Sequence, residues 1–245
     1  MTVDLASART PHGMRIYAIG DVHGYAGLLK AMHACIDADL KARPPADWRI
    51  IHIGDYVDRG PDSKRVIDFL IARMATDHRI LALRGNHDQG MLDFLQAPDP
   101  FGMFATNGGD RTARSYGVDL SFDGEEAFQQ TARLFSAAVP AMHTRFLAER
   151  PYSAGFGDYY FCHAGIQPGV PLAGQRPEAL MWIRDAFLGC DHLHEKVIIH
   201  GHTPEDEVDF RANRINIDTG VYLRQKLSSL VLEDDERSVL TVYQD

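Results

Sequence analysis

Cysteine is scarce in this chain of 245 residues: it has three, Cys35, Cys162 and Cys190, which are widely spaced. An odd number of dispersed cysteines excludes a disulfide framework and is typical of a reducing compartment. No apolar run approaches the ~18 residues that a membrane-spanning helix needs. The first thirteen residues lack the basic start and apolar core of a secretory signal. We therefore expect a cytoplasmic protein with no membrane partner.

Positive charge is also in short supply. The chain has 25 Lys and Arg against 34 Asp and Glu, a net charge of −9 with His neutral. A protein that binds nucleic-acid backbones needs a basic face, so this balance argues against a nucleic-acid polymer as partner. A phosphorylated peptide or a small phosphorylated substrate is compatible with it, because metal ions and a few local arginines can supply the positive field.

Low-complexity tracts and internal repeats are absent as well. Apolar residues make up 45% of the chain and charged residues 24%, which is ordinary for a globular protein. The length is large for one domain, but big α/β folds reach it without splitting. We therefore expect a single domain over residues 1–245, with its oligomeric state open.

What the sequence does contain is a pattern that occurs five times: a short β-branched or aromatic run that ends in glycine and then in residue types that bind metals. Such runs predict buried strands. They are MRIYAIGDVHG (14–24), WRIIHIGDYVDRG (48–60), HRILALRGNHD (78–88), GDYYFCHAG (157–165) and EKVIIHGHTP (195–204).

Amphipathic helices are predicted between the first three strands, over 27–43 and 63–75, with Ser63 as a candidate N-cap. This alternation favours a parallel sheet with right-handed crossovers, in which ligands bind beyond the carboxyl ends of the strands. Residues 89–150 break it and predict a helical insertion, interrupted at Pro140. The strand-like segments after residue 214, including a hairpin, suggest a second sheet packed on the first.

Each polar cluster taken alone has a simple structural explanation as a turn, a loop or a buried histidine. Together they place six nitrogen and oxygen ligands beside one crevice. Six such ligands without cysteine exceed one structural zinc site and suit two divalent metals that share a bridging carboxylate, Mn first, with Fe or Zn as alternatives. The six are Asp21, His23, Asp55, Asn86, His163 and His202.

Phosphoryl transfer is the chemistry that such a centre suits, because two metals lower the pKa of a shared water and clamp the attacking and leaving oxygens. Arg59 and Arg184 can bind the phosphoryl oxygens through their forked guanidinium groups. His87 can be the general acid, and Asp58 can orient it and raise its pKa. Asp55 would then be the bridging carboxylate.

The ordered motifs GDVHG, GDYVDRG, RGNHD, HAG and GHT resemble those of the phosphoprotein phosphatase branch of the calcineurin-like metallophosphoesterases, over residues 15 to 220. The resemblance implies an α/β sandwich of two β-sheets flanked by helices, with a binuclear metal site. It assigns Asp21 and His23 to the first metal, Asp55 to the bridge, Asn86, His163 and His202 to the second metal, His87 and Asp58 to the acid and its partner, and Arg59 and Arg184 to phosphate. The chain is shorter than eukaryotic members, so their peptide grooves do not carry over, and Asp218 in NIDTG receives no role.

Two substrates are compatible with this machinery. The leading hypothesis is a phosphoserine or phosphothreonine protein phosphatase, in which a metal-bridging hydroxide attacks in line. The alternative is symmetrical hydrolysis of a dinucleoside polyphosphate such as diadenosine tetraphosphate. A third reading, a non-catalytic phosphate sensor, would require a missing ligand or acid, and none is missing.

Several other residues receive structural interpretations. His200 is expected to be structural, and His52 to lie in the core or at a sheet edge. His192 and His194 are expected in a solvated loop. Trp182 is expected to anchor its loop; a nucleotide substrate would favour base stacking instead.

Overall fold

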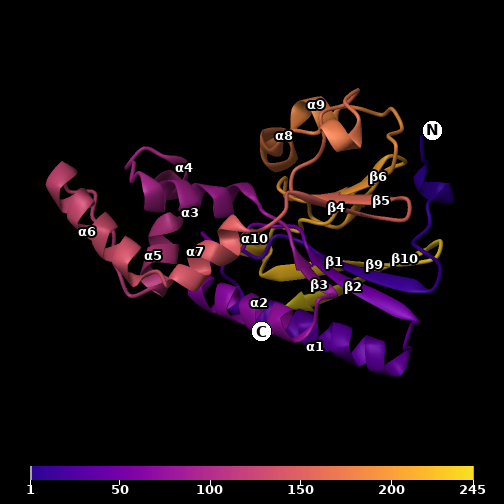
Figure 1. Ribbon diagram of the computed structural model, residues 1–245, viewed down its shortest axis with the longest axis horizontal. Coiled ribbons are helices and arrows are strands. Elements are labelled where there is room, and N and C mark those ends of the chain that lie inside the picture. Colours follow the sequence, from indigo (N-terminus) through magenta and orange to yellow (C-terminus); the bar gives the residue numbers. More distant parts are fainter. Residues whose placement is uncertain (1, 245) are drawn as a thin grey trace.

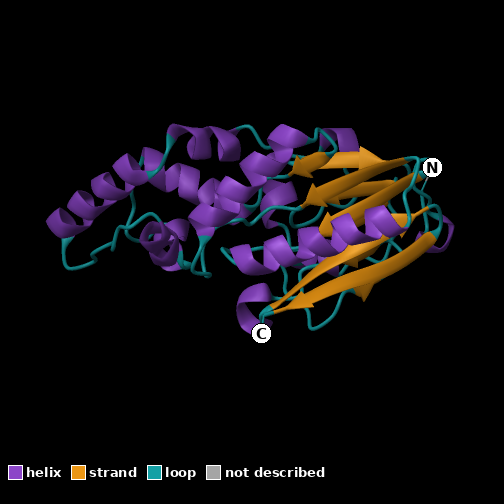
Figure 2. Cartoon of the chain, turned by 90° about the horizontal axis from the view of Figure 1, so that it is seen from below, coloured by secondary structure: helices purple, strands orange, loops and turns teal. Residues whose placement is uncertain are grey.

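The computed structural model describes residues 2–244 and contains two five-stranded β-sheets packed against each other. Helices cover their outer faces, and a helical insertion extends from one end (Figure 1). Seen from below, the strands gather at the end opposite to the insertion (Figure 2). The predicted sandwich of two sheets flanked by helices is thus confirmed.

The first sheet has the strand order β10-β9-β1-β2-β3. Its three N-terminal strands are parallel, and α1 and α2 form the two crossovers, as the alternation predicted. Its C-terminal hairpin runs antiparallel to β1. The elements are β1 (Met14–Ile19), α1 (Ala26–Ala42), β2 (Asp47–His52), α2 (Ser63–Thr76), β3 (Ile80–Ala82), β9 (Lys226–Glu233) and β10 (Glu236–Tyr243).

The second sheet has the order β4-β5-β6-β8-β7, with β5, β6 and β8 parallel and the two edge strands antiparallel. Short helices α8 and α9 cover its outer face, and α10 precedes β9 (Figure 1). Its elements are β4 (Ser153–Phe156), β5 (Tyr159–Cys162), α8 (Pro177–Trp182), α9 (Asp185–Leu188), β6 (Val197–His200), β7 (Asp209–Phe210), β8 (Arg214–Asn216) and α10 (Val221–Arg224). Two 3-10 turns lie at Leu5–Ser7 and Leu172–Gly174.

Strand assignment to sheets differs from the expectation in one respect. The fourth and fifth predicted strands lie in the second sheet, whereas the C-terminal hairpin joins the first sheet through β9. Hydrophobic patterning shows that a strand is buried but does not show which strand lies next to it, because that depends on packing far along the chain.

Alternating residues of β1 show how both faces of the first sheet are buried. Ile16 and Ala18 pack into the layer between the sheets, together with residues such as Phe161 and Ile199 of the second sheet. Tyr17 lies on the other face, in the cluster under α1. A strand with a sheet on one side and a helix on the other is apolar on both faces, as this one is.

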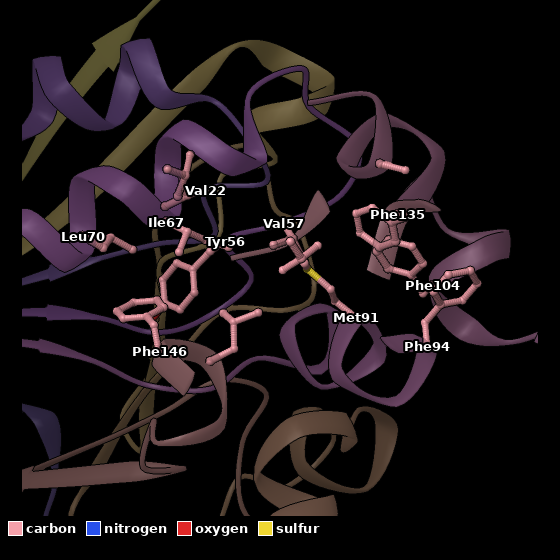
Figure 3. Packing of buried hydrophobic residues seen from close by; sticks show 14 of the residues in the cluster. Val22, Tyr56, Val57, Ile67, Leu70, Met91, Phe94, Phe104, Phe135 and Phe146 are labelled. Carbon is pink, nitrogen blue, oxygen red and sulfur yellow. The ribbon is translucent and has the colours of Figure 1, made fainter. Parts of the chain in front are cut away.

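The predicted insertion over 89–150 is confirmed as a set of helices that share one aromatic core with α2. Phe94, Phe104 and Phe135 pack together there, and the same cluster continues through Val57 to Ile67 (Figure 3). The break expected at Pro140 separates two of the helices. The helices of this region are α3 (Asn86–Gln96), α4 (Met103–Thr106), α5 (Gly109–Ser115), α6 (Glu125–Ala138) and α7 (Ala141–Ala148).

Ser63 does not cap α2. The residue before the helix is Asp62, and its side chain makes no capping hydrogen bond. The Ser63 hydroxyl instead accepts from the backbone N–H of Asp58 at 3.2 Å and contacts the Thr112 hydroxyl at 2.9 Å. Among residues 2–244, no helix is both long enough and apolar enough to cross a membrane.

Candidate metal and phosphate site

All ten predicted site residues lie in or beside loops that follow the carboxyl ends of strands in both sheets, except Arg184, which precedes α9. The first sheet supplies the loops after β1, β2 and β3, and the second sheet supplies those after β5 and β6. Direct contacts, described below, connect each residue to at least one other of the set. Arg59 is partly buried, and eight others are buried: Asp21, His23, Asp55, Asp58, Asn86, His87, His163 and His202.

Left-handed backbone conformations concentrate in this site. Seven non-glycine residues in the described chain have positive φ, and five of them are predicted site residues. Such conformations cost on the order of 1–3 kcal/mol each and persist only where the surroundings hold them. The five are His23 (43°), Asp55 (55°), Asp58 (70°), Arg59 (64°) and His202 (67°).

Asp88 holds the strained loop after β2 and was not singled out from the sequence. Its buried carboxylate accepts hydrogen bonds from the backbone N–H groups of Gly85, Asp55 and Tyr56, each at 2.9 Å. Burial, and then the charge of Asp55, raise the pKa of Asp88 to about 8. The signal was available, because Asp88 ends the RGNHD motif.

Two glycines allow the loops after β2 and β3 to approach. Gly54 has a φ of 113°, and a Cβ there would lie 2.5 Å from the backbone nitrogen of Gly85. A Cβ on Gly85 would in turn overlap the carboxylate of Asp55. Side chains at either position would therefore separate Asp55 from Asn86.

The Asp55 carboxylate lies between histidines from the two sheets. Its Oδ2 is 3.5 Å from His23 Nε2, and its Oδ1 is 3.4 Å from His163 Nε2. Two groups of three side chains have ligand atoms within 4.8 Å of one another, His23–Asp55–His87 and Asp55–His163–His202. Asp55 belongs to both, which is the position of a bridging ligand.

Backbone carbonyls fix two of the histidine rings. Nδ1 of His23 donates to Val57 O at 2.9 Å, and Nδ1 of His163 donates to Ile53 O at 3.2 Å. In neutral rings these bonds leave Nε2 as an unprotonated nitrogen directed into the site. The lone pair of His163 Nε2 faces Asn86 Oδ1 at 2.8 Å, so electron-pair donors converge there as they do around a cation.

Burial shapes the ionisation of these ligands. It lowers the pKa of His163 to about 3 and that of His202 to about 2, which keeps both imidazoles in the neutral form that binds metals. Burial, followed by repulsion from Asp218, raises the pKa of Asp21 well above its usual value, and burial likewise raises that of Asp55. Buried carboxylates that repel one another beside neutral imidazoles fit divalent cations.

Asp21 is oriented by the second sheet. Its two carboxylate oxygens accept from the backbone N–H of His202 at 3.3 and 3.4 Å. Among the described residues it joins neither of the three-residue groups around Asp55. Its position beside His202 and Asp218 brings it to the site without placing it in direct contact with His23.

His87 and Asp58 form a buried pair. Nδ1 of His87 lies 2.7 Å from Asp58 Oδ2, and the Thr112 hydroxyl donates to Asp58 Oδ1 at 2.8 Å. Burial lowers the pKa of His87 to about 4 and raises that of Asp58 well above its usual value. The pKa of His87 is low because burial outweighs the opposing charge of Asp55, and the influence of Asp58 on this pKa stays a prediction.

The two arginines contact different candidate ligands. Arg59 Nη1 lies 3.3 Å from His23 Nε2, and its guanidinium stacks on Tyr222, 4.1 Å from the ring centroid. Arg184 Nε donates to His202 Nε2 at 3.0 Å. Neither arginine forms an ion pair with any carboxylate of residues 2–244.

The structure also gives the burial of the remaining histidines and of Trp182, and this burial differs from the prediction at His194. His200 and His52 are buried, as expected, and His192 is exposed. His194 is buried against Phe187, with ring centroids 6.0 Å apart, so its assignment to a solvated loop is wrong. Trp182 is 45% exposed, and its ring lies edge-on to His202.

Comparison with known proteins gives a family match over most of the chain. Residues 14–226 match the family model described as calcineurin-like phosphoesterase. The chain is 29% identical to serine/threonine-protein phosphatase 1 of Salmonella typhimurium over 224 residues, which cover 87% of this chain and 89% of that one. It is 24% identical to the asymmetrical bis(5'-nucleosyl)-tetraphosphatase of Anoxybacillus flavithermus over 233 residues, 86% of this chain and 88% of that one.

Solved structures share the fold at lower identity. A putative diadenosine tetraphosphatase superposes with a TM-score of 0.64 at 15% identity, covering 97% of this chain and 100% of that one. A cold-active protein tyrosine phosphatase gives 0.58 at 17% identity, covering 95% and 81%. These similarities concern the arrangement of the two sheets and their helices.

Proposed function

The chain belongs to the calcineurin-like phosphoesterase family, and from this premise we propose that it is a binuclear-metal phosphatase that hydrolyses phosphoserine and phosphothreonine in proteins. The observation that carries the proposal is the position of Asp55, whose two oxygens face histidines of different sheets. A shared carboxylate between two ligand groups is what a two-metal phosphoryl-transfer site requires.

The donor set fits two divalent ions, Mn²⁺ first and Fe or Zn as alternatives. In this proposal Asp21 and His23 would hold one ion, Asn86, His163 and His202 would hold the other, and Asp55 would contribute to both. Bound ions would supply Lewis acidity and positive charge to the attacking and leaving oxygens.

The protein's own groups would bind the phosphoryl oxygens and deliver a proton. Arg59 and Arg184, which form no ion pair in the described chain, have guanidinium N–H groups free to donate to a phosphate. His87 would give a proton to the leaving-group oxygen from Nε2, while Asp58 holds the ring through Nδ1 at 2.7 Å. Thr112 in turn fixes Asp58.

A second candidate function is hydrolysis of dinucleoside polyphosphates by the same groups. It is favoured by the relative that is named an asymmetrical tetraphosphatase. The motifs pointed to symmetrical cleavage, and the two modes differ in their products. Symmetrical cleavage of diadenosine tetraphosphate yields two ADP, whereas asymmetrical cleavage yields ATP and AMP.

Product analysis with the Mn²⁺-loaded protein tests both candidates. A phosphoserine peptide and diadenosine tetraphosphate, at matched concentrations, are followed by phosphate release and by chromatography of the nucleotides. We expect faster turnover of the peptide. Preferential formation of ADP, or of ATP and AMP, would favour the second candidate and identify its mode. If the protein holds two metals per chain yet cleaves neither substrate, the proposed function is wrong.

A further inference from the structure

A groove of about 340 Å³ adjoins the candidate metal site, and most of its lining has no part in the mechanism above. Arg59 belongs to both the groove and the site, whereas Arg111 and the two tyrosine rings belong to the groove alone. The full lining is Tyr25, Arg59, Asn107, Gly108, Arg111 and Tyr222.

The groove is built by contacts between the insertion and the loop that carries Arg59. The backbone N–H of Arg59 donates to Gly108 O at 3.3 Å, and that of Asp58 donates to the Thr112 hydroxyl at 2.8 Å. Gly108 has a φ of 97°, and a Cβ there would lie 2.7 Å from the nitrogen of Arg59. Arg111 lies between these two anchor points in the first turn of α5, so its backbone is fixed beside the site.

The groove holds two guanidinium groups without a carboxylate partner in the described chain. Arg111 makes no side-chain ion pair there, and its neighbour Asp110 pairs with Arg114 at 3.0 Å. The guanidinium of Arg59 has His23 and the Tyr222 ring as its close partners. Two unpaired cations in one groove of a chain with a net charge of −9 attract an anionic ligand.

Because Arg59 belongs to both the metal site and the groove, an anion bound in the groove lies next to the scissile phosphoryl group. One side of Arg59 faces His23 in the metal site, and the same side chain lines the groove. A guanidinium presents five N–H donors in a rigid fork, so it can bind two anionic groups that lie next to each other. A second phosphoryl group joined through one oxygen meets this requirement, whereas a carboxylate on the next peptide residue is several bonds farther away.

We propose that Arg111 is a specificity-determining residue: with Arg59 it binds a second phosphoryl group attached to the scissile one, flanked by the rings of Tyr25 and Tyr222. The ligand class is a phosphoanhydride such as a nucleoside polyphosphate, which is the substrate class of the second candidate function. This inference rests on the proposed function only in placing the scissile phosphoryl group at the metal site. A simple phosphomonoester leaves the groove empty.

Equilibrium binding tests the groove without requiring turnover. The full-length protein, loaded with Mn²⁺ at a fixed free concentration, is titrated calorimetrically with inorganic phosphate and with pyrophosphate. We expect pyrophosphate to bind roughly ten- to a hundredfold more tightly than phosphate. In Arg111→Ala this preference should fall by most of that factor, and in Arg111→Lys by less, because a point charge replaces the fork.

Arg133→Ala is the matched control, since Arg133 is an exposed arginine on α6, the insertion helix farthest from the sheets (Figure 1). It should keep the preference for pyrophosphate. Equal preferences in the Arg111→Ala and Arg133→Ala proteins would overturn the proposal and leave Arg111 a solvated surface residue. Failure of phosphate itself to bind the metal-loaded protein would instead count against the metal site.

A second pair of ligands tests whether the anion bound in the groove is a phosphoryl group or a peptide carboxylate. Phosphoserine peptides with Glu or Ala after the phosphorylated residue are compared in the same proteins. If Arg111→Ala removes a preference for the acidic peptide but not for pyrophosphate, the second-phosphoryl assignment is wrong and the groove binds a peptide carboxylate. Loss of the pyrophosphate preference alone supports the assignment.

Discussion

At the scale of single residues, the site depends on side chains whose positions are set by neighbours rather than by their own preferences. Asp55 and Asp58 both have positive φ, which is unfavourable for residues with a Cβ. Asp88 and Thr112 hold them there through buried hydrogen bonds. Substitutions of Asp55 and Asp58 therefore test the chemistry of the site, whereas substitutions of Asp88 and Thr112 test the backbone geometry of the loop after β2.

The role of His87 predicts a dependence on the leaving group. His87→Asn removes the proton donor, so turnover of phenyl phosphate should fall by about 10²- to 10⁴-fold, with a much smaller loss for p-nitrophenyl phosphate. Steady-state kinetics with both esters measures the difference. Because His87 also lies near Asp55, metal analysis is essential: retention of two metals supports an acid, and loss of one would make His87 a ligand.

The bridging position of Asp55 predicts metal loss. Asp55→Asn keeps an oxygen donor but removes the negative charge that both ions would share, so metal content should fall from two to below one per chain. Elemental analysis after dialysis against Mn²⁺ checks this. Asp58→Asn is the control, because it makes the same substitution at an equally buried aspartate, and this variant should retain two metals per chain. Full occupancy and activity in Asp55→Asn would remove Asp55 from the ligand set.

At the scale of secondary-structure elements, the insertion contacts the loop after β2 at a few positions. The first turns of α5 contact the loop after β2 through Gly108 and Thr112. The Thr112 hydroxyl accepts from Asp58 N–H and donates to Asp58 Oδ1. The insertion thus positions the partner of the proposed acid as well as the groove.

Removing this hydroxyl should affect both stability and activity. Thr112→Val keeps the shape but leaves the buried Oδ1 of Asp58 without its hydroxyl donor, at a cost of roughly 1–3 kcal/mol in the free energy of unfolding. Turnover of phenyl phosphate should fall with it, since His87 loses its fixed partner. Urea unfolding and kinetics measure the two effects, and Thr112→Ser should restore both. Wild-type behaviour of Thr112→Val would show that α5 does not position Asp58.

At the scale of the whole molecule, the site exists only because the two sheets pack together. The loops after β1, β2 and β3 bring Asp21, Asp55 and Asn86, whereas His163 and His202 follow strands of the second sheet. Global unfolding therefore removes the site at once, and conditions that weaken the fold also weaken metal binding.

Acid should destabilise the fold through a buried histidine pair outside the site. Nε2 of His33 and Nε2 of His52 lie 3.1 Å apart. Burial, and then Arg73, lower the pKa of His33 to about 4, although Asp37 opposes this, and burial and His33 lower that of His52. At these two positions the unfolded chain binds more protons below about pH 6.5, so the contribution of the pair to stability falls as the pH drops from 6.5 toward 4 and changes little above 6.5.

Urea unfolding of the metal-free protein at several pH values measures this loss, which should reach about 2–3 kcal/mol at pH 4.5 for His33 alone. The double variant His33→Leu with His52→Leu should lose correspondingly less stability over the same range. Other buried histidines contribute equally to both proteins, so the difference reports on the pair. Identical pH slopes would show that these rings already accept protons in the folded state.

Local sequence patterns determined much of this protein. Periods of two and 3.6 residues distinguish strands from helices, and glycine after each strand marks a turn, so the α/β class and the insertion could be predicted. Nine of the ten candidate site residues were recognisable because their types and their positions after strands are local properties, and Arg184 was matched through the family resemblance. The structure brings all ten to one region, while their individual roles stay predictions.

Only the tertiary structure decided which elements became neighbours. It joined the C-terminal hairpin to β1, placed Asp88 and Thr112 against the loop after β2, and set Arg111 beside Arg59. It also decided that burial outweighs the charge of Asp55 in setting the pKa of His87. These outcomes depend on packing between segments far apart in the chain, and such packing leaves no local pattern from which it could be predicted.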